Sequence, residues 1–313
     1  ERALHHHRPR ATLVSGRQRR QADEGQAHSC RGRRDLHRRV PFGTGAAGRA
    51  IYRALKDEFN IVAFIDNNPN KQGTKYCDIE ICSVQNVVNL KFDYVYLGGI
   101  WADEMEAQLL NLIDKSKIKV LDEKDISFST PSRQVATDEI MRVLDGYFKE
   151  IKMDYFLCNS ALISLLRGNS LSVVSDVDLY VMNYADLEYL ARELPHFLGS
   201  EYKLNLHYVK GDAAVRTDGQ IKQICITNNL SESIVIDIGL FDEYENFMVC
   251  DYDDGRFFYF PKEIFEGGFT RLEYMGFELN VLKHYNEYLE FMYGKNYLEM
   301  PKRFSSNDYL NLK

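Results

Sequence analysis

Two carboxylates lie one residue apart in the stretch SVVSDVDLYVM, residues 172–182. The surrounding Val, Leu and Tyr residues are typical of a buried strand. Because strand side chains alternate between faces, Asp176 and Asp178 should point the same way and lie side by side. Like charges at that separation repel each other unless something neutralises them. The pattern therefore predicts a positive group, most simply a cation, beside these two acids.

A second apolar stretch, SIVIDIGLF at residues 233–241, is also predicted to be a strand and carries a single acid, Asp237. A strand, a short helix, a D-x-D strand and a later strand with one acid follow each other in nucleotidyltransferase-like folds. Three carboxylates on adjacent strands can hold Mg²⁺ or Mn²⁺, which prefer oxygen ligands and can clamp a donor's phosphates. We therefore predict Asp176, Asp178 and Asp237 as metal ligands and catalytic residues. The competing interpretation of a D-x-D pair is an exposed acidic edge strand.

The segment before the acids predicts a phosphate site. YFLCNS is expected to be a strand that leads into a short helix beginning near Asn159 and Ser160. Backbone N–H groups at the start of such a helix can bind phosphate oxygens. Arg167 follows the helix, and its guanidinium suits the same anion. The alternative is that Arg167 only complements the negative end of the helix dipole.

These residues resemble the LicD family. The stretch YFLCNSALISLLRGNSLSVVSDVDLYV has that family's order of strand, small residues, an LLGxxR-like helix and an acid-rich strand, and VIDIGLF resembles its later strand. The stretches YFPKEIF and YLEFMYGKNYLEMPKR resemble the family's ending. The resemblance covers residues 137–303. The matching positions are Leu162, Arg167, Asp176, Asp178, Pro261, Tyr288, Leu289, Tyr293, Gly294, Tyr297 and Pro301.

The resemblance implies a transferase that decorates cell-surface glycans such as lipopolysaccharide or capsule. LicD-like and fukutin-type proteins move a phosphorylated alcohol, such as phosphocholine or ribitol phosphate, from a CDP-activated donor to a glycan acceptor, with Mg²⁺ or Mn²⁺. The chain departs from the family at Asn159-Ser160, where Gly-Gly or Gly-Thr is usual. It also departs at residues 173–175, where a Pro-Trp-Asp-Asp run is usual. These departures concern the substrate pocket and leave the acids in place.

Three other functions remain open. The same acids could serve a nucleotidyltransferase that uses an NTP. D-x-D could hold a nucleotide sugar in a glycosyltransferase. The chain could also be a non-catalytic sensor of sugar nucleotides, with its N-terminal half as the working part.

That half carries a glycine fingerprint, Gly43, Gly45 and Gly48, followed by a helical pattern and by the strand IVAFID, which ends at Asp66. This spacing favours a dinucleotide site, with the pyrophosphate at the helix N-terminus and Asp66 on a ribose hydroxyl. The alternative is that the glycines only allow tight packing of helix on sheet. The stretch FIDNNPNKQG…IEICSVQNV resembles Rossmann-like domains of bacterial glycan-assembly proteins. A nucleotide or nucleotide sugar is therefore the expected ligand.

The fold expected is α/β in two domains. Residues 41–130 should form a Rossmann-like parallel sheet, since short strands alternate with helices. Residues 131–313 should form an α+β nucleotidyltransferase-like domain, after a linker at 129–134. Residues 1–40 hold eleven Arg, five His, no Lys and only four acids. We interpret them as a disordered or foreign basic segment that is dispensable, because they have no periodic apolar face, and the strand expected before Gly43 is missing. A basic arm for anionic lipid or nucleic acid is the alternative.

Composition narrows the partners. The chain has a net charge of −7, and the part after residue 40 is about −14, which argues against nucleic acid as its partner. No apolar run reaches the roughly 20 residues of a membrane span. The six cysteines are scattered without a CxxC pair. Such a pattern predicts reduced thiols and a cytoplasmic location, in the cytosol or at the inner face of the membrane.

Overall fold

The computed structural model describes residues 37–122, 128–211, 215–228, 234–252, 255–299 and 308–313. Within these ranges, no helix combines the length and the apolar character needed to cross a membrane. The basic segment at residues 1–36 lies outside the described residues.

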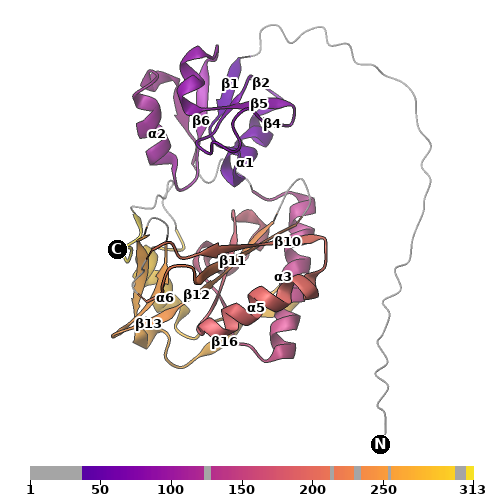
Figure 1. Cartoon of the computed structure of the whole chain (residues 1–313), viewed down its shortest axis with the longest axis vertical. Coiled ribbons are helices and arrows are strands. Elements are labelled where there is room, and N and C mark those ends of the chain that lie inside the picture. The colour runs from indigo at the N-terminus through magenta and orange to yellow at the C-terminus, as the bar shows by residue number, and fades with distance from the viewer. Residues whose placement is uncertain (1–36, 123–127, 212–214, 229–233, 253–254, 300–307) are drawn as a thin grey trace, which may run out of the picture. The chain divides into compact units, whose positions relative to one another are not determined.

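A four-stranded, fully parallel sheet forms the centre of the N-terminal domain (Figure 1). Helices cover both of its faces. Val95 packs in one buried cluster with α2, while the next residue, Tyr96, packs in another with α1, and adjacent strand residues point to opposite faces. The strand order is β2 (Asn60–Ile61), β1 (Arg38–Pro41), β6 (Tyr94–Leu97) and β7 (Ile118–Val120), and the helices are α1 (Ala46–Leu55) and α2 (Ala102–Leu110). The Rossmann-like parallel sheet expected for this half is confirmed.

The predicted strand IVAFID is divided in two. Its first part belongs to β2, and its second part, β3 (Phe64–Ile65), pairs with a different sheet. There β3 runs parallel to β5 (Ile79–Cys82), which is antiparallel to β4 (Lys75–Tyr76). Phe64 and Ile65 are fully buried, so the short strand is held by its side chains as well as by its hydrogen bonds. Two 3₁₀ turns, Val84–Asn89 and Lys115–Lys117, complete the domain.

The strand that we expected to be missing before Gly43 is present. β1 begins at Arg38 and pairs with β2 on one side and β6 on the other, so the boundary expected at residue 41 falls inside a central strand. The sequence pattern did not indicate β1 because the charged residue Arg39 occupies a buried position in it. Its guanidinium lies 4.4 Å from the ring centre of Phe59 and 4.8 Å from that of Tyr94, and the residue is 5% exposed. Aromatic rings thus accept a cation where the pattern called for an apolar residue.

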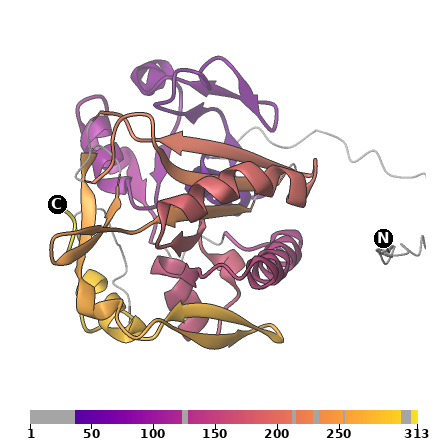
Figure 2. The same ribbon diagram turned by 60° about the horizontal axis from the view of Figure 1, so that its bottom comes forward.

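The C-terminal domain contains a mixed sheet of five strands. The central pair, β9 and β12, is parallel, and the three other pairings are antiparallel. The helix α5 (Tyr184–Leu198) packs across one face of this sheet (Figure 2). The order is β10 (Tyr202–Tyr208), β11 (Ile221–Asn228), β12 (Val235–Leu240), β9 (Val177–Val181) and β8 (Phe156–Leu157). The α+β class predicted for this domain is confirmed.

The segment at 129–134, predicted as a linker, is largely helix. α3 spans Pro131–Ile151, with Pro131 in its first turn. The Thr130 hydroxyl accepts a hydrogen bond from the Arg133 backbone N–H at 3.2 Å and caps the helix. Thr as a cap followed directly by Pro is a helix start signal, because proline's missing N–H costs nothing there. The prediction was wrong because this signal was taken for a break.

The remaining elements enclose the sheet in one buried core. This core joins residues from α3, α4, α5, the five-stranded sheet and the elements that follow it. The strands β14 and β15 pair antiparallel. These further elements are α4 (Asn159–Leu166), 3₁₀ turns at Leu171–Val173 and Lys262–Ile264, β13 (Asp242–Tyr244), β14 (Phe247–Asp251), β15 (Phe257–Pro261), β16 (Phe269–Tyr274), β17 (Phe277–Leu282) and α6 (Tyr285–Tyr293).

Candidate active site

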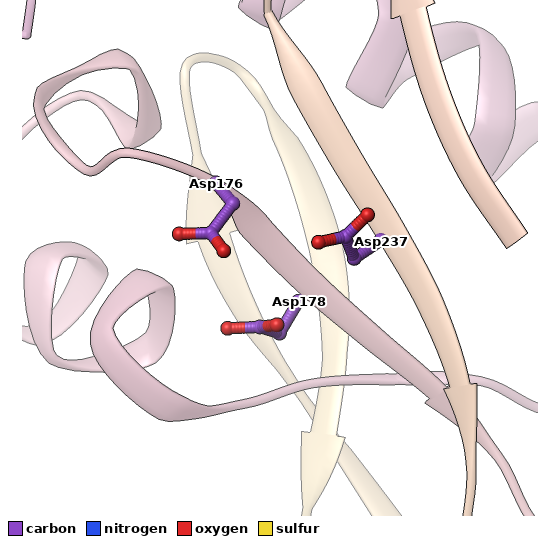
Figure 3. A group of neighbouring side chains, drawn as sticks. All are labelled: Asp176, Asp178 and Asp237. Atoms are coloured by element: carbon purple, nitrogen blue, oxygen red, sulfur yellow. The ribbon is translucent and has the colours of Figure 1, made fainter. Parts of the chain in front are cut away.

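Three carboxylates converge on the sheet of the C-terminal domain. Asp178 lies in β9 directly opposite Asp237 of the parallel strand β12, and Asp176 immediately precedes β9. One carboxylate oxygen of each lies within 4.8 Å of those of the other two. Figure 3 shows the three side chains turned toward one region beside the two strands. The convergence expected from the alternation of strand residues is therefore found.

Ionisation of Asp178 and of Asp237 is unfavourable. Burial raises the pKa of Asp178 well above its usual range, and the charges of Asp176 and Asp237 raise it further. Burial, followed by the charge of Asp176, raises the pKa of Asp237 to about 7. Both shifts reflect the cost of placing several like charges in a poorly solvated space. The cluster would be relieved by a cation.

The donor set fits such a cation. The Asp237 Oδ1 atom is buried and has no hydrogen-bond partner among the described residues, although such atoms are normally paired. All three side chains offer carboxylate oxygens, which suit Mg²⁺ and Mn²⁺. Asp176, Asp178 and Asp237 are thus the residues that would hold a divalent metal.

The start of α4 orients one of the acids. The Asn159 amide donates a hydrogen bond to Asp178, and its oxygen accepts one from the Tyr288 hydroxyl at 2.7 Å. Asn159 has a φ of +53°, in the left-handed region where Gly is favoured and Asn is tolerated. This explains why an Asn stands where the LicD pattern has Gly. No side chain caps α4, and Asn159 and Ser160 line the same cavity as the acids.

Arg167 is engaged by the chain itself. It follows α4, is exposed, and donates from Nε and Nη2 to the backbone oxygen of Leu298, at 2.9 and 2.6 Å. It also lines the cavity that contains the acids. In this structure Arg167 fixes the segment after α6, and its predicted contact with phosphate stays a prediction.

The glycine fingerprint shapes a tight turn. Gly43 has a φ of +83°, and a Cβ on Gly48 would lie 1.9 Å from the Gly43 oxygen, so both positions require glycine. A Cβ on Gly45, by contrast, would have nothing within 4 Å. The second glycine is therefore the one whose absence of a side chain leaves room for a ligand. Gly43 and Gly48 have a structural role whether or not a ligand binds.

Asp66 is tied to the same turn. Its Oδ2 accepts hydrogen bonds from the Thr44 backbone N–H at 2.9 Å and from the Thr44 hydroxyl at 2.6 Å. Oδ1 accepts from the Asn68 N–H at 2.9 Å. Burial opposes ionisation of Asp66, but these bonds outweigh it and lower its pKa. The predicted contact of Asp66 with a ribose stays a prediction, and the carboxylate's present role is to hold the glycine turn.

Two neighbours of the acids were not predicted. Cys225 of β11 lies directly opposite Asp237, and the side chains of Cys225 and Gln223 lower the pKa of Asp237 against the larger opposing effect of burial. Burial, followed by the Asp237 charge, raises the pKa of the Cys225 thiol to about 12, so it is a neutral donor. The alternation in KQICITN indicates that Gln223 and Cys225 lie on one face of the strand. Only the register with β12 shows that this face is the one that carries Asp237.

Comparisons with known proteins bear mainly on the N-terminal domain. Residues 37–121 match the family model described as C2185-like, N-terminal. No curated protein matches the chain. No LicD family model matches it either, so that resemblance rests on the residues quoted above.

Several solved structures are similar to parts of the chain at low sequence identity. UDP-D-quinovosamine 4-dehydrogenase from Vibrio fischeri is 22% identical over 28% of this chain and 76% of its own, with a TM-score of 0.25. The lincosamide antibiotic adenylyltransferase LnuA, with lincomycin bound, is 13% identical over 55% of this chain and 90% of its own, with a TM-score of 0.33. The Rex-family repressor RSP, in complex with NAD⁺ and operator DNA, is 20% identical over 37% and 61%, with a TM-score of 0.23.

Proposed function

We propose that the C-terminal domain is a metal-dependent transferase acting on a nucleotide-activated phosphate donor. The observation that carries the proposal is the convergence of three partly buried carboxylates, in which the buried Asp237 Oδ1 atom has no partner among the described residues. A bound Mg²⁺ or Mn²⁺ would supply charge neutralisation of the donor's phosphates and of the leaving group. The protein's own part is to hold the acids in place, and Asn159 does so for Asp178.

The finer proposal names the donor and the acceptor. The donor is a CDP-activated alcohol, and the acceptor is a hydroxyl of a cell-surface glycan. The acceptor oxygen forms a bond to the phosphorus that bears the alcohol, the bond from that phosphorus to the bridging oxygen breaks, CMP leaves, and the hydroxyl proton is lost to solvent. Support for this choice comes from the LicD-like stretches, including Tyr288, whose hydroxyl positions Asn159.

The second candidate is a nucleotidyltransferase that uses an NTP. The observation favouring it is the order of the elements: β8, the short helix α4, the D-x-D strand β9, and β12 with the third acid, in one mixed sheet. In that reaction the attack falls on the α-phosphorus and pyrophosphate leaves. A glycosyltransferase would attack a sugar carbon and release a nucleoside diphosphate.

The leaving group decides between these candidates. The whole chain would be incubated with Mn²⁺ or Mg²⁺ and with CDP-choline, CDP-ribitol, CTP, ATP or UDP-glucose, with a glycan panel or water as acceptor, and the released nucleotide measured by chromatography. We expect metal-dependent CMP release, abolished in Asp178→Asn and retained in Asp154→Asn, a matched control because Asp154 is exposed. Pyrophosphate from CTP or ATP would establish the second candidate instead.

We further propose that the N-terminal domain binds a nucleotide or nucleotide sugar at its glycine turn. Gly45 supports this, because its missing side chain leaves open space beside the N-terminus of α1. Calorimetric titration of the whole chain with UDP-glucose and with NAD⁺ would test it. A bulky Gly45→Val change should abolish the binding, and equal binding by both proteins would contradict the proposal.

A further inference from the structure

The segment Asp308–Lys313 extends a sheet of the C-terminal domain. The Phe257 N–H donates to the Lys313 oxygen at 2.9 Å, and the Lys313 N–H donates back to the Phe257 oxygen at 3.0 Å. Leu312 forms an antiparallel bridge with Phe258, next to the pair. The segment therefore adds to the edge of β15 through main-chain hydrogen bonds, as an extra strand would.

A buried side chain anchors the segment a second time. Asn311 is fully buried; its amide donates to the Tyr259 oxygen at 3.0 Å, and its backbone oxygen accepts from the Tyr259 N–H at 3.2 Å. The Leu310 N–H donates to the Met292 oxygen at the end of α6, at 3.0 Å. The segment is thus fixed to two separate elements, β15 and α6.

This anchoring delivers an aromatic ring to the acidic site. The Tyr309 ring centre lies 4.9 Å from that of Phe258, 5.6 Å from that of Tyr293 and 6.1 Å from that of Tyr252. Tyr309 and Tyr293 line the same cavity as Asp176 and Asp178. Burial raises the pKa of Tyr309, and the charges of Asp178 and Asp176 raise it further, as expected of a phenol beside the acids.

The chemistry of this wall differs from that of the acids. Tyrosine offers a flat apolar face and one hydroxyl, which together suit a ring that carries hydroxyl groups, as a nucleoside or a sugar does. The carboxylates and their cation would take the phosphates, so the tyrosines are left for the organic part of a substrate.

We infer that Asp308–Lys313 is a working part of the active site and that Tyr309, with Tyr293, binds the ring-bearing organic part of the donor or acceptor. This inference deepens the function proposed above and depends on it. It assigns the segment a specificity-determining role, separate from metal binding.

The test uses variants of the whole chain. Tyr309→Leu keeps an apolar side chain but removes the ring and its hydroxyl, and Asn311→Ala removes the side-chain hydrogen bond from the segment to Tyr259 of β15 without altering Tyr309. Tyr208→Leu is the matched control, since Tyr208 is 50% exposed on β10. For each, the Kd of every nucleotide donor is measured by calorimetry with Mn²⁺ present, the acceptor KM and kcat by turnover, and Mn²⁺ binding alone by electron paramagnetic resonance.

We expect Tyr309→Leu and Asn311→Ala to raise either the donor Kd or the acceptor KM by about tenfold or more, which is the scale of losing one aromatic stack. Mn²⁺ binding should be unchanged. A raised donor Kd would identify the nucleoside as the group bound, and a raised acceptor KM would identify the glycan. Wild-type constants in both variants would overturn the inference while leaving the proposed function intact. The same loss measured with CTP as the only ligand bound would support the inference and overturn the CDP-alcohol proposal.

Discussion

Asp178 and Asp237 lie directly opposite each other on neighbouring parallel strands, with no basic residue between them in the pairing. Asp176 adds a third charge within coordination distance. The free-energy cost of this arrangement is lowered when a bound cation or a proton neutralises part of the charge. The repulsion is therefore a measurable property of the protein without metal.

Replacing one of the acids should stabilise the metal-free protein. Asp178→Asn removes one of the mutually repelling charges while keeping the side chain's size, so its melting temperature in EDTA should exceed that of the wild type. Saturating Mn²⁺ should raise the melting temperature of the wild type. At a concentration 100 times the Kd, the free energy of unfolding should rise by about 2.7 kcal/mol. The variant should lose this response, and Asp154→Asn should keep it. A wild type that is indifferent to Mn²⁺ would contradict the metal site.

Two substitutions of Asn159 distinguish its effect on backbone strain from its effect on catalysis. Asn159→Gly and Asn159→Ala both lose the hydrogen bond to Tyr288, but glycine accepts the φ of +53° freely, so the Gly variant should be the more stable of the two. Asn159→Ala should be less stable by about 1 kcal/mol, since alanine disfavours that conformation. Both variants lose the amide that orients Asp178, so both should lower kcat. Denaturant unfolding and turnover measurements would check this, and equal stability of the two variants would contradict the strain argument.

Replacing Gly48, the third glycine of the fingerprint, should destabilise the fold. Gly48→Ala places a methyl group where it meets the Gly43 oxygen at 1.9 Å before any shift, so we expect a loss of about 1–3 kcal/mol. Gly146→Ala is the control: it lies within α3 with nothing inside 4 Å of the new methyl, and should stabilise by up to about 1 kcal/mol. Thermal unfolding would compare the two. Equal and small effects would show that the turn can relax.

Asp145 should make stability depend on pH. It accepts hydrogen bonds from Lys149 at 2.6 Å, Tyr155 at 2.9 Å and Arg271 at 3.0 Å, and so ties α3 to β16. Burial opposes its ionisation, yet these bonds lower its pKa below the ordinary 3.8. A lowered carboxyl pKa contributes stability that is complete above the ordinary value and is lost as the pH falls through the folded one. Asp145→Asn should therefore cost about 2–4 kcal/mol at pH 7 and clearly less at pH 3.

Urea unfolding at the two pH values would measure this. Glu150→Gln, an exposed position on the same helix, is the control and should change stability little at either pH. A cost of Asp145→Asn that does not vary with pH would show that the carboxylate's charge is irrelevant.

The acidic site was predictable because it depends on the shortest sequence rule, the alternation of strand side chains. Asp176 and Asp178 had to share a face, and a second apolar strand with one acid was the natural partner. The residues that reach the site from distant parts of the chain were not predictable. Tyr288 reaches Asn159 across 129 residues of chain, and no local pattern encodes such a distance.

Local rules failed where tertiary contacts replaced them. Arg39 occupies a buried strand position because two aromatic rings accept its guanidinium. At Thr130 and Pro131 a helix cap occupies the place where the pattern predicted a linker. Tyr309 lies six residues after the end of the quoted family ending, and backbone hydrogen bonds to β15 and α6 bring the segment that carries it to the site.

The central place of β1 sets the limit for shortening the protein. Cutting away the whole basic segment through residue 40 would remove Arg38, Arg39 and Val40, and with them the strand between β2 and β6. β2 and β6 would then lose the strand with which both pair, and their unpaired backbone groups could form hydrogen bonds with another chain. Such a product should aggregate on expression, so any truncated version of this protein should begin before His37, ahead of β1.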